Sequence, residues 1–437
     1  MNLHKIDVAK ILAPNGSVRR ALGALSAKLL GSLLALFLGI VVARLLGANS
    51  AGIYYLAMAV ITFLGSIGRA GLDFVVIRRM AAGIADGSWA QAHGCLRECL
   101  GHSATLSSVF AIALVLAAPW LADSVFHKPE LRIALQLGAF AVVPFAMINL
   151  FSASLKAQIR PGAAQTVEST LLPGFTLIAI PIAVWLLPEN AAISGYLFGT
   201  IAAASVGWLI SRHGPLKQSA ISARVGGLWK AGSPFIGTTV INQIMTWSPV
   251  FILGYMAHNS EIAIYTSSAR LALAVSLALV AINSASVGIY AKLYHEGNIK
   301  GLTKEVRRST IIGFIIGAPI MIALALGAEM ALGLYGDEFI AGSNILRIIL
   351  IGQLFNVIMG PLGQVLSISK NESYLMGSFA IGLTVQLLLL LLLTPNFGGV
   401  GVALSQSASA IVINIAAFAF TRTRLGINIF GQGRRQI

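Results

Sequence analysis

Long hydrophobic runs alternate with short polar breaks along the whole chain. A membrane-spanning helix needs about 20 mostly apolar residues. The runs long enough for this are residues 23–45, 52–76, 103–121, 132–153, 169–187, 191–211, 232–256, 262–288, 309–331, 341–366, 374–394 and 398–420. The pattern predicts an all-α integral membrane protein with about twelve transmembrane helices.

The breaks between the runs carry residues that favour turns. They contain Gly47–Ser50, Lys128–Glu130, Pro188–Asn190, Gly336–Glu338 and Pro395–Asn396. We therefore expect short connections, the longest on the outer side being about ten residues. The fifth and sixth runs are short and nearly continuous, so their boundary is the least distinct.

Composition supports the membrane class and fixes an orientation. Only 10% of the 437 residues are charged and 57% are hydrophobic, whereas soluble domains carry about 25% charged residues. Lys and Arg are enriched on cytoplasmic loops close to helix ends, and most of the 30 Lys and Arg residues here lie on one side if the N-terminus is cytoplasmic. We expect both termini in the cytoplasm. The net charge of +15 is then a topology signal and predicts no nucleic-acid partner.

Weak repeats divide the chain into two halves with six spans each. Asn49–Ser50 with Ile53–Tyr54 resembles Asn259–Ser260 with Ile264–Tyr265. An even number of spans per half predicts a parallel repeat, in which two lobes enclose a central substrate cavity. The predicted units are a cytoplasmic segment 1–22, an N-lobe 23–211, a basic linker 212–231, a C-lobe 232–420 and a cytoplasmic tail 421–437.

Several cations fall inside the predicted spans. They include Lys28, Arg69, Arg270 and Arg347, and each costs about 2.5–3.5 kcal/mol at a helix centre on the insertion scale. Such residues usually face a wet cavity and mark a pathway. Asp73 follows Arg69 by one helical turn, so a local ion pair, or a role in coupling, is the alternative for those two.

The sign of these embedded charges favours an anionic ligand. Arginine binds phosphate through a planar fork of donors. An exporter of cationic drugs should instead carry embedded acids, and this chain offers Asp73, with Glu168 and Glu329 at helix ends. We predict a substrate-binding cavity formed by Lys28, Arg69, Arg270 and Arg347.

Uncharged amides also lie within the predicted spans. Candidates for contacts with sugar hydroxyls are Asn149, Gln243, Asn283, Gln353 and Asn356. The alternative for each is a hydrogen bond between helices.

Signatures of catalysis and of cofactor binding are missing from the sequence. The chain has no GxxxxGK[ST] phosphate loop and no HExxH motif, and the pair Cys95 and Cys99 lacks a usual zinc spacing. The sequence therefore predicts no enzyme, no metal and no cofactor.

Three segments resemble the polysaccharide export family. They are Leu45–Gly47 with Gly52–Tyr55, Gly68–Asp73 and Arg78–Arg79; Leu334–Phe339 with Ile345–Ile348; and Pro395–Leu404. The resemblance covers nearly the whole chain and implies the fold of the multidrug/oligosaccharidyl-lipid/polysaccharide (MOP) exporter superfamily.

Within that superfamily the chain looks most like flippases for O-antigen or exopolysaccharide repeat units. These carry an undecaprenyl-diphosphate-linked oligosaccharide from the cytoplasmic to the periplasmic leaflet by alternating access. The resemblance implies membrane lipids and polysaccharide polymerase or ligase components as partners. The alternatives are a cation-coupled multidrug or toxin exporter and a lipid II-type flippase. Lipid II flippases typically have fourteen helices, which this chain cannot accommodate.

Overall fold

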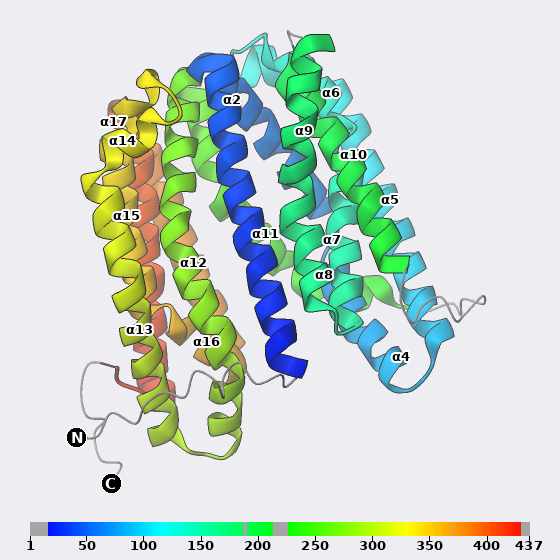
Figure 1. Ribbon diagram of the computed structural model, residues 1–437, viewed down its shortest axis with the longest axis vertical. Coiled ribbons are helices and arrows are strands. Elements are labelled where there is room, and N and C mark those ends of the chain that lie inside the picture. Colours follow the sequence, from blue (N-terminus) through cyan, green and yellow to red (C-terminus); the bar gives the residue numbers. More distant parts are fainter. Residues whose placement is uncertain (1–15, 187–189, 213–225, 370, 430–437) are drawn as a thin grey trace.

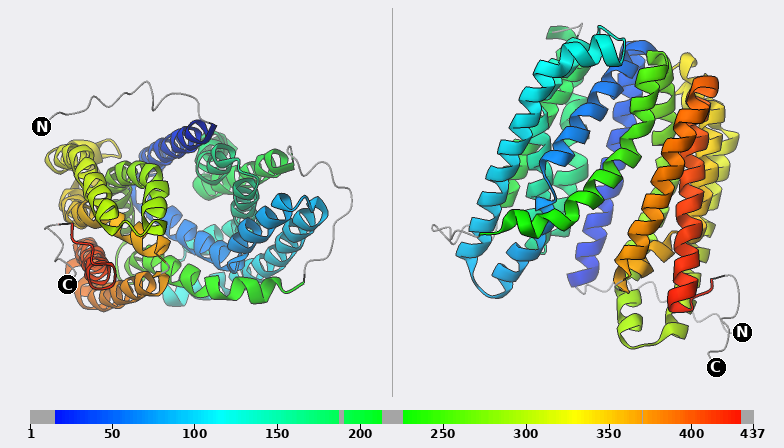
Figure 2. Two further views of the ribbon diagram at one scale, coloured as in Figure 1. Left: turned by 90° about the horizontal axis from the view of Figure 1, so that it is seen from below. Right: turned by 180° about the vertical axis from the view of Figure 1, so that it is seen from behind.

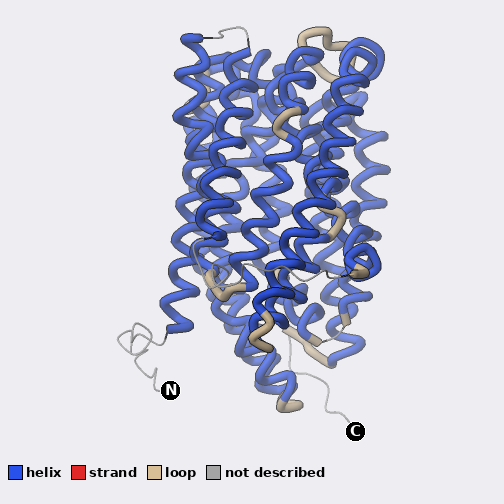
Figure 3. The backbone as a smooth tube through the Cα atoms, turned by 90° about the vertical axis from the view of Figure 1, so that its right-hand side faces the viewer, coloured by secondary structure: helices blue, strands red, loops and turns tan. Residues whose placement is uncertain are grey.

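The computed structural model describes residues 16–186, 190–212, 226–369 and 371–429. In this part of the chain the backbone is helical apart from short turns (Figure 3). The predicted segment 1–22 lies mostly outside it, as do the centre of the linker 212–231 and the end of the tail 421–437.

The first lobe, called the N-lobe, contains the helices up to α10. Its elements are α2 (Gly16–Gly68), α3 (Leu72–Val75), η1 (Val76–Met80), α4 (Ala81–Ala85), α5 (Trp89–Trp120), η2 (Leu121–Val125), α6 (Leu131–Ala139), α7 (Val142–Ala157), α8 (Pro161–Gln165), η3 (Thr166–Thr170), α9 (Leu171–Leu186) and α10 (Ala191–Arg212).

The second lobe, called the C-lobe, contains the remaining helices. Its elements are α11 (Leu228–Met256), α12 (Asn259–His295), α13 (Ile299–Leu326), α14 (Ala328–Gly333), η6 (Asp337–Gly342), α15 (Ser343–Met359), α16 (Pro361–Ile368) and α17 (Glu372–Leu425). The two lobes stand side by side in Figure 1, with α2 between them, and Figure 2 shows their helices arranged in a ring when seen from below.

The number of spans agrees with the sequence prediction. Eight helices are long and apolar enough to cross a membrane, or nine if the bent pair α6 and α7 is one span. Two of these, α2 and α17, each break at a glycine with non-helical backbone angles, Gly47 and Gly398, and therefore form two spans apiece. With the 37-residue α12, the described chain contains about twelve spans, and the predicted fold class is confirmed.

Helix ends differ from the predicted ones in a systematic way. The turns expected over residues 47–50 and 395–396 lie within helices that break at Gly47 and at Gly398. Glycine reaches the positive φ of these breaks without a steric penalty. At the opposite end, α5, α12 and α13 extend beyond their apolar runs into polar sequence. Hydrophobic length measures the part of a helix in lipid, and polar turns outside the lipid can continue the same helix.

The lobes meet at the end where α2 breaks at Gly47, which we call the hairpin end. Arg44 of α2 donates to the carbonyls of Gly333 and Leu334 at 2.7 and 2.9 Å. Lys128 donates to the Ala257 carbonyl at 2.8 Å, and Asn259 Nδ2 donates to Asn49 Oδ1 at 3.0 Å. These contacts join loops of both lobes and close this end of the bundle.

At the opposite end, where α2 begins and α17 ends, the lobes touch along one seam. Phe74 and Phe235 stack with ring centroids 4.7 Å apart. Arg79 donates to the carbonyls of Gly226 and Gly227 at 2.8 and 3.3 Å. Both contacts involve the start of α11, so the seam lies next to the connection between the lobes.

Candidate functional site

A cavity of about 490 Å³ lies between α11, α12, α15 and the two segments of α17. Its wall is mixed, with apolar side chains such as Val250, Leu273 and Phe379 beside many polar ones. The polar residues are Asn242, Thr246, Trp247, Tyr265, Thr266, Arg270, Gln353, Asn356, Gln386, Gln406, Ser407 and Ser409. Arg270 carries the only charge among the described residues that line it. This cavity is lined by helices of the C-lobe.

Arg270 reaches from the C-lobe cavity to the N-lobe. Its guanidinium lies over the Tyr55 ring, with Cζ 4.5 Å from the ring centroid, and Nη2 donates to the Met58 sulfur at 3.7 Å. Gly39 makes room for it, because a Cβ there would lie 3.3 Å from Nη1. A cation over an aromatic face gains about 0.5–2 kcal/mol. In the described chain no acidic side chain forms an ion pair with Arg270, so its charge is available to an anionic ligand.

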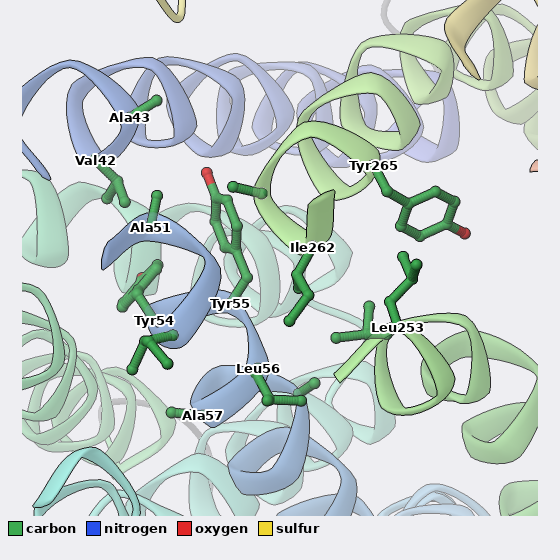
Figure 4. Close-up of a cluster of buried hydrophobic side chains, with 14 of the residues drawn as sticks. Val42, Ala43, Ala51, Tyr54, Tyr55, Leu56, Ala57, Leu253, Ile262 and Tyr265 are labelled. Carbon is green, nitrogen blue, oxygen red and sulfur yellow. The ribbon is translucent and has the colours of Figure 1, made fainter. Parts of the chain in front are cut away.

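Tyr55 belongs to a large cluster of buried hydrophobic side chains. Figure 4 shows it on the second segment of α2, beside Tyr54 and Leu56 and near Ile262 of α12. The ring of Tyr55 is 1% exposed, so the surrounding side chains fix its position. The guanidinium of Arg270, on the C-lobe, therefore contacts an aromatic ring of the N-lobe whose position is fixed by its packing.

Two of the five predicted amides line the same cavity as Arg270. Gln353 Oε1 accepts from Ser276 Oγ at 2.8 Å and from Asn356 Nδ2 at 3.2 Å. Asn356 Oδ1 in turn accepts from Asn414 Nδ2 at 2.6 Å. The amides thus form a chain that crosses from α12 through α15 to α17.

The other three predicted amides lie away from this wall. Asn149 Nδ2 donates to the Phe145 carbonyl on its own helix α7 at 3.0 Å. Gln243 Oε1 accepts from Trp247 Nε1 at 3.1 Å on α11. Asn283 lies further along α12, and its buried Oδ1 has no hydrogen-bond partner in the described structure.

Arg69 and Asp73 form the local ion pair that their spacing suggested. Arg69 Nη1 lies 3.0 Å from Asp73 Oδ2, and the two side chains are 13% and 22% exposed. The chain turns sharply between them, with positive φ at Ala70 and Gly71. The pair spans this turn, and Arg69 has its acid partner there.

Lys28 and Arg347 are also placed apart from the cavity. Lys28 Nζ lies 3.5 Å from Ser169 Oγ in the N-lobe. Next to it Glu168 accepts from Lys156 at 2.5 Å and from Ser152 at 2.7 Å. Arg347 is 41% exposed and lies 3.5 Å from Glu329. Of the four predicted cations, Arg270 alone lines the described cavity.

Sequence reasoning missed the aromatic and hydroxyl partners of the site. Tyr55 and Tyr265 lie in apolar runs and read as ordinary core residues. Asn414, an amide within the predicted span 398–420, carried the same signal as the five chosen amides and was overlooked. Polar residues inside a span were a usable signal, since Gln386 and Gln406 also line the cavity.

A metal site is not formed by the described side chains. No group of three or more His, Cys, Asp or Glu side chains is placed to hold an ion in the part of the chain that the structure describes. Cys95 and Cys99 are buried in the packing of α5.

The two-lobed bundle of long apolar helices defines the chain as a multi-pass membrane protein. Within that class, the family model described as polysaccharide biosynthesis protein matches residues 17–293, more than half of the chain. The chain belongs to this polysaccharide biosynthesis protein family. The MatE family model also matches, over residues 234–392. No curated protein sequence matches significantly.

Solved structures share the fold at low sequence identity. An inward-facing multidrug resistance MATE family transporter of the MOP superfamily superposes with a TM-score of 0.75, at 15% identity over 93% of this chain and 98% of that one. The lipid II flippase MurJ in an inward closed conformation gives 0.69, at 15% identity over 91% and 86%. An outward-facing MATE transporter gives 0.62, at 15% identity over 93% and 95%.

Proposed function

We propose that the chain is a flippase that moves an undecaprenyl-diphosphate-linked oligosaccharide, an O-antigen or exopolysaccharide repeat unit, from the cytoplasmic to the periplasmic leaflet. The observation that carries the proposal is the C-lobe cavity, whose described lining combines many amides and hydroxyls with one cation, Arg270, and contains no acid. The family match to polysaccharide biosynthesis proteins supports it.

The charge of the cavity favours a phosphorylated ligand. A guanidinium binds phosphate through parallel hydrogen bonds, and these are stronger in a site with little water. Arg270 has no acid partner among the described residues, so a ligand would supply the missing negative charge. A cationic drug would instead meet a charge of its own sign at this place.

The closed hairpin end supports loading from the side of the termini. The enrichment of Lys and Arg on that side supports a cytoplasmic location for it. Contacts of Arg44, Lys128 and Asn259 seal the opposite end. This arrangement is an inward-facing state of an alternating-access cycle, and the better superposition on the inward-facing relative supports it. The cycle proceeds when the hairpin contacts open and the cytoplasmic side closes.

The other predicted cations take different parts in this proposal. Lys28, with Lys156 and Glu168 beside it, provides positive charge on the N-lobe where the headgroup enters. Arg69 and Asp73 stabilise the turn after α2. Arg347 belongs to the hairpin end and pairs with Glu329.

Two related functions each have an observation in their favour. The MatE family match and the 0.75 TM-score favour a cation-coupled drug or toxin exporter. The likeness to MurJ favours a lipid II-type flippase. The absence of an acid from the described cavity lining argues against the exporter, since a cationic drug needs one.

A reconstituted flipping assay tests the proposal. Liposomes containing the purified protein receive a polyprenyl-diphosphate-linked oligosaccharide, and accessibility of the sugar on each leaflet reports flipping. Arg270→Ala should slow flipping about 10- to 150-fold, because hydrogen bonds to a charged group contribute about 1.5–3 kcal/mol. Arg270→Lys keeps the charge and should retain part of the rate. Arg347→Ala is the matched control, an arginine on the neighbouring α15 that lies outside the cavity.

Two outcomes would refute the proposal. One is a wild-type protein that exports cationic dyes and does not flip the lipid-linked sugar. The other is an Arg270→Ala protein that flips at the rate of Arg347→Ala.

A further inference from the structure

The amide of Gln353 has a fixed direction in the cavity wall. Its oxygen already accepts two hydrogen bonds, from Ser276 Oγ at 2.8 Å and from Asn356 Nδ2 at 3.2 Å. An amide oxygen has two lone pairs, so its acceptor capacity is used. The Nε2 group has no hydrogen-bond partner among the described residues and is left for the cavity that Gln353 lines.

A backbone carbonyl fixes this direction at the far end of the chain of amides. Asn414 Nδ2 donates to the Ala410 carbonyl at 2.8 Å, and a carbonyl can only accept. The same Nδ2 group donates to Asn356 Oδ1 at 2.6 Å, so Asn356 must turn its own Nδ2 toward Gln353. Reversing Gln353 would place two donors opposite each other and leave the Asn356 donor unpaired, which costs about 1–3 kcal/mol when buried.

Gln406 repeats the arrangement on the second segment of α17. Its Oε1 accepts from the Tyr265 hydroxyl at 2.8 Å. Tyr265 and Gln406 both line the cavity. The tyrosine hydroxyl thus uses one of the two lone pairs of the Gln406 oxygen, whereas both are used at Gln353. The Gln406 Nε2 group has no hydrogen-bond partner among the described residues and is the second free amide donor.

We propose that Gln353, Gln406 and Arg270 together bind the diphosphate linkage of the substrate through their N–H groups. We call these three side chains the donor wall. This rests on the proposed function and names the groups within that site. All three present N–H groups, and a diphosphate offers oxygen acceptors only. A sugar hydroxyl both donates and accepts, so it gains less from these three donors than from Gln386. The Nε2 group of Gln386 donates to the Met245 carbonyl at 2.8 Å and to Ser248 Oγ at 3.2 Å, and its oxygen is left for the same cavity. Gln353 is thereby a phosphate contact, whereas it was predicted as a sugar contact.

The same geometry separates Gln353 from Asn356. Both the oxygen and the Nδ2 group of Asn356 are bonded within the protein. Asn356 is therefore a positioning residue that orients Gln353, although it too lines the cavity. This difference gives each residue a distinct expected response to substitution.

The test measures inhibition of flipping by inorganic pyrophosphate added on the side of the termini. Gln353→Glu replaces the free donor with an anionic acceptor of the same size, and Gln353→Met removes it without adding charge. We expect Gln353→Met to need roughly tenfold more pyrophosphate for half inhibition, and Gln353→Glu to need more still. Gln243→Glu is the matched control, because the Gln243 oxygen already accepts from Trp247 and the side chain lies outside the cavity.

Asn356→Asp tests the positioning role separately. An aspartate cannot donate to Gln353, so the Gln353 amide turns its Nε2 group toward the new carboxylate and its oxygen toward the cavity. The pyrophosphate requirement should rise several-fold in Asn356→Asp. In the double variant Asn356→Asp with Gln353→Met the requirement should rise by less than the product of the two single increases, because both changes act on one donor and only the repulsion by the new carboxylate adds to the effect of Gln353→Met.

The outcomes distinguish this inference from the proposed function. If wild type flips the lipid and pyrophosphate inhibits Gln353→Met and Gln353→Glu as strongly as wild type, the donor wall is refuted and the flippase stands. Wild-type flipping that pyrophosphate does not inhibit at all also refutes the donor wall. A wild type that does not flip the lipid refutes the proposed function itself.

Discussion

Closure of the hairpin end depends on the missing side chain of Gly52, and Gly52→Ala should force the lobes apart there. Gly52 lies on the second segment of α2 and faces the first residue of α12, Asn259. A Cβ at position 52 would lie 1.9 Å from the Asn259 carbonyl oxygen and 2.6 Å from its carbon. The obstacle is backbone of the other lobe, so no side-chain rotation removes it.

The size of the opening follows from these distances. Ordinary contact begins near 3.4 Å, so the lobes must separate by about 1.5 Å at this point. The neighbouring 2.8 Å bond from Lys128 to Ala257 would then stretch to about 4.3 Å, outside hydrogen-bond range. Overpacking a tight contact costs about 1–3 kcal/mol. If this free-energy cost falls on the closed state alone, the ratio of open to closed protein rises about 5- to 150-fold.

Electron–electron distance measurements between spin labels report the change. Suitable label positions are the exposed Asp123 in η2 and the exposed Ala341 in η6, one on each lobe at the hairpin end. The label background replaces Cys95 and Cys99 with alanine. We expect Gly52→Ala to increase a long-distance population at the expense of the short one.

Two glycine variants serve as controls. Gly195→Ala meets Ile180 at 2.6–3.0 Å inside the N-lobe, so it should lower stability without opening the lobes. Gly101→Ala meets nothing within 4 Å and should be silent. A folded Gly52→Ala protein with the wild-type distance distribution would show that contact at position 52 does not control closure.

Three further predictions concern single contacts. Tyr55→Leu removes the ring under Arg270 and should raise the open population about 2- to 30-fold, since a cation–π contact contributes about 0.5–2 kcal/mol. Tyr55→Phe keeps the ring and should match wild type in the same spin-label measurement. Equal open populations in the two variants would contradict the role of the ring. Gly398→Ala puts an alanine where the backbone has φ 51°, and its Cβ would clash with the Glu261 carboxylate. The free energy of unfolding should fall by about 1–3 kcal/mol. An unchanged thermal midpoint would contradict this. Burial lowers the pKa of Lys128. Between that lowered pKa and the ordinary value of lysine, the unfolded chain binds more protons than the folded one, so the free energy of unfolding rises with pH. The thermal midpoint of wild type minus that of Lys128→Met should therefore rise across this alkaline window, and a difference that falls would contradict the prediction.

The local sequence pattern was enough to predict the membrane spans and one ion pair. Hydrophobic length depends on a stretch of about 20 residues, so about twelve helices could be counted without any knowledge of their neighbours. The four-residue spacing of Arg69 and Asp73 in a predicted helix allowed their pairing to be weighed before any coordinates, and the pair forms although the helix breaks between them. Arg270 attracted attention because a cation deep in a span is expensive.

The partners of the remaining polar residues could not be predicted in this way. Glu329 lies on α14 and Arg347 on α15, and their contact depends on how these elements pack. The same holds for Lys156 with Glu168 and for Tyr55 with Arg270. None of these pairs has a spacing that local helix geometry dictates.

The sequence by itself determined the membrane class, the approximate number of spans and the presence of costly cations within them. Tertiary structure alone decided that Arg270 shares a cavity with Gln353 while Lys28 and Arg347 do not, and that the Gln353 amide oxygen is bonded within the protein. The physical reason is that these helices are apolar on nearly every side. Lipid and protein interior are both apolar, so hydrophobicity specifies depth in the membrane and leaves the rotation of each helix to its packing partners.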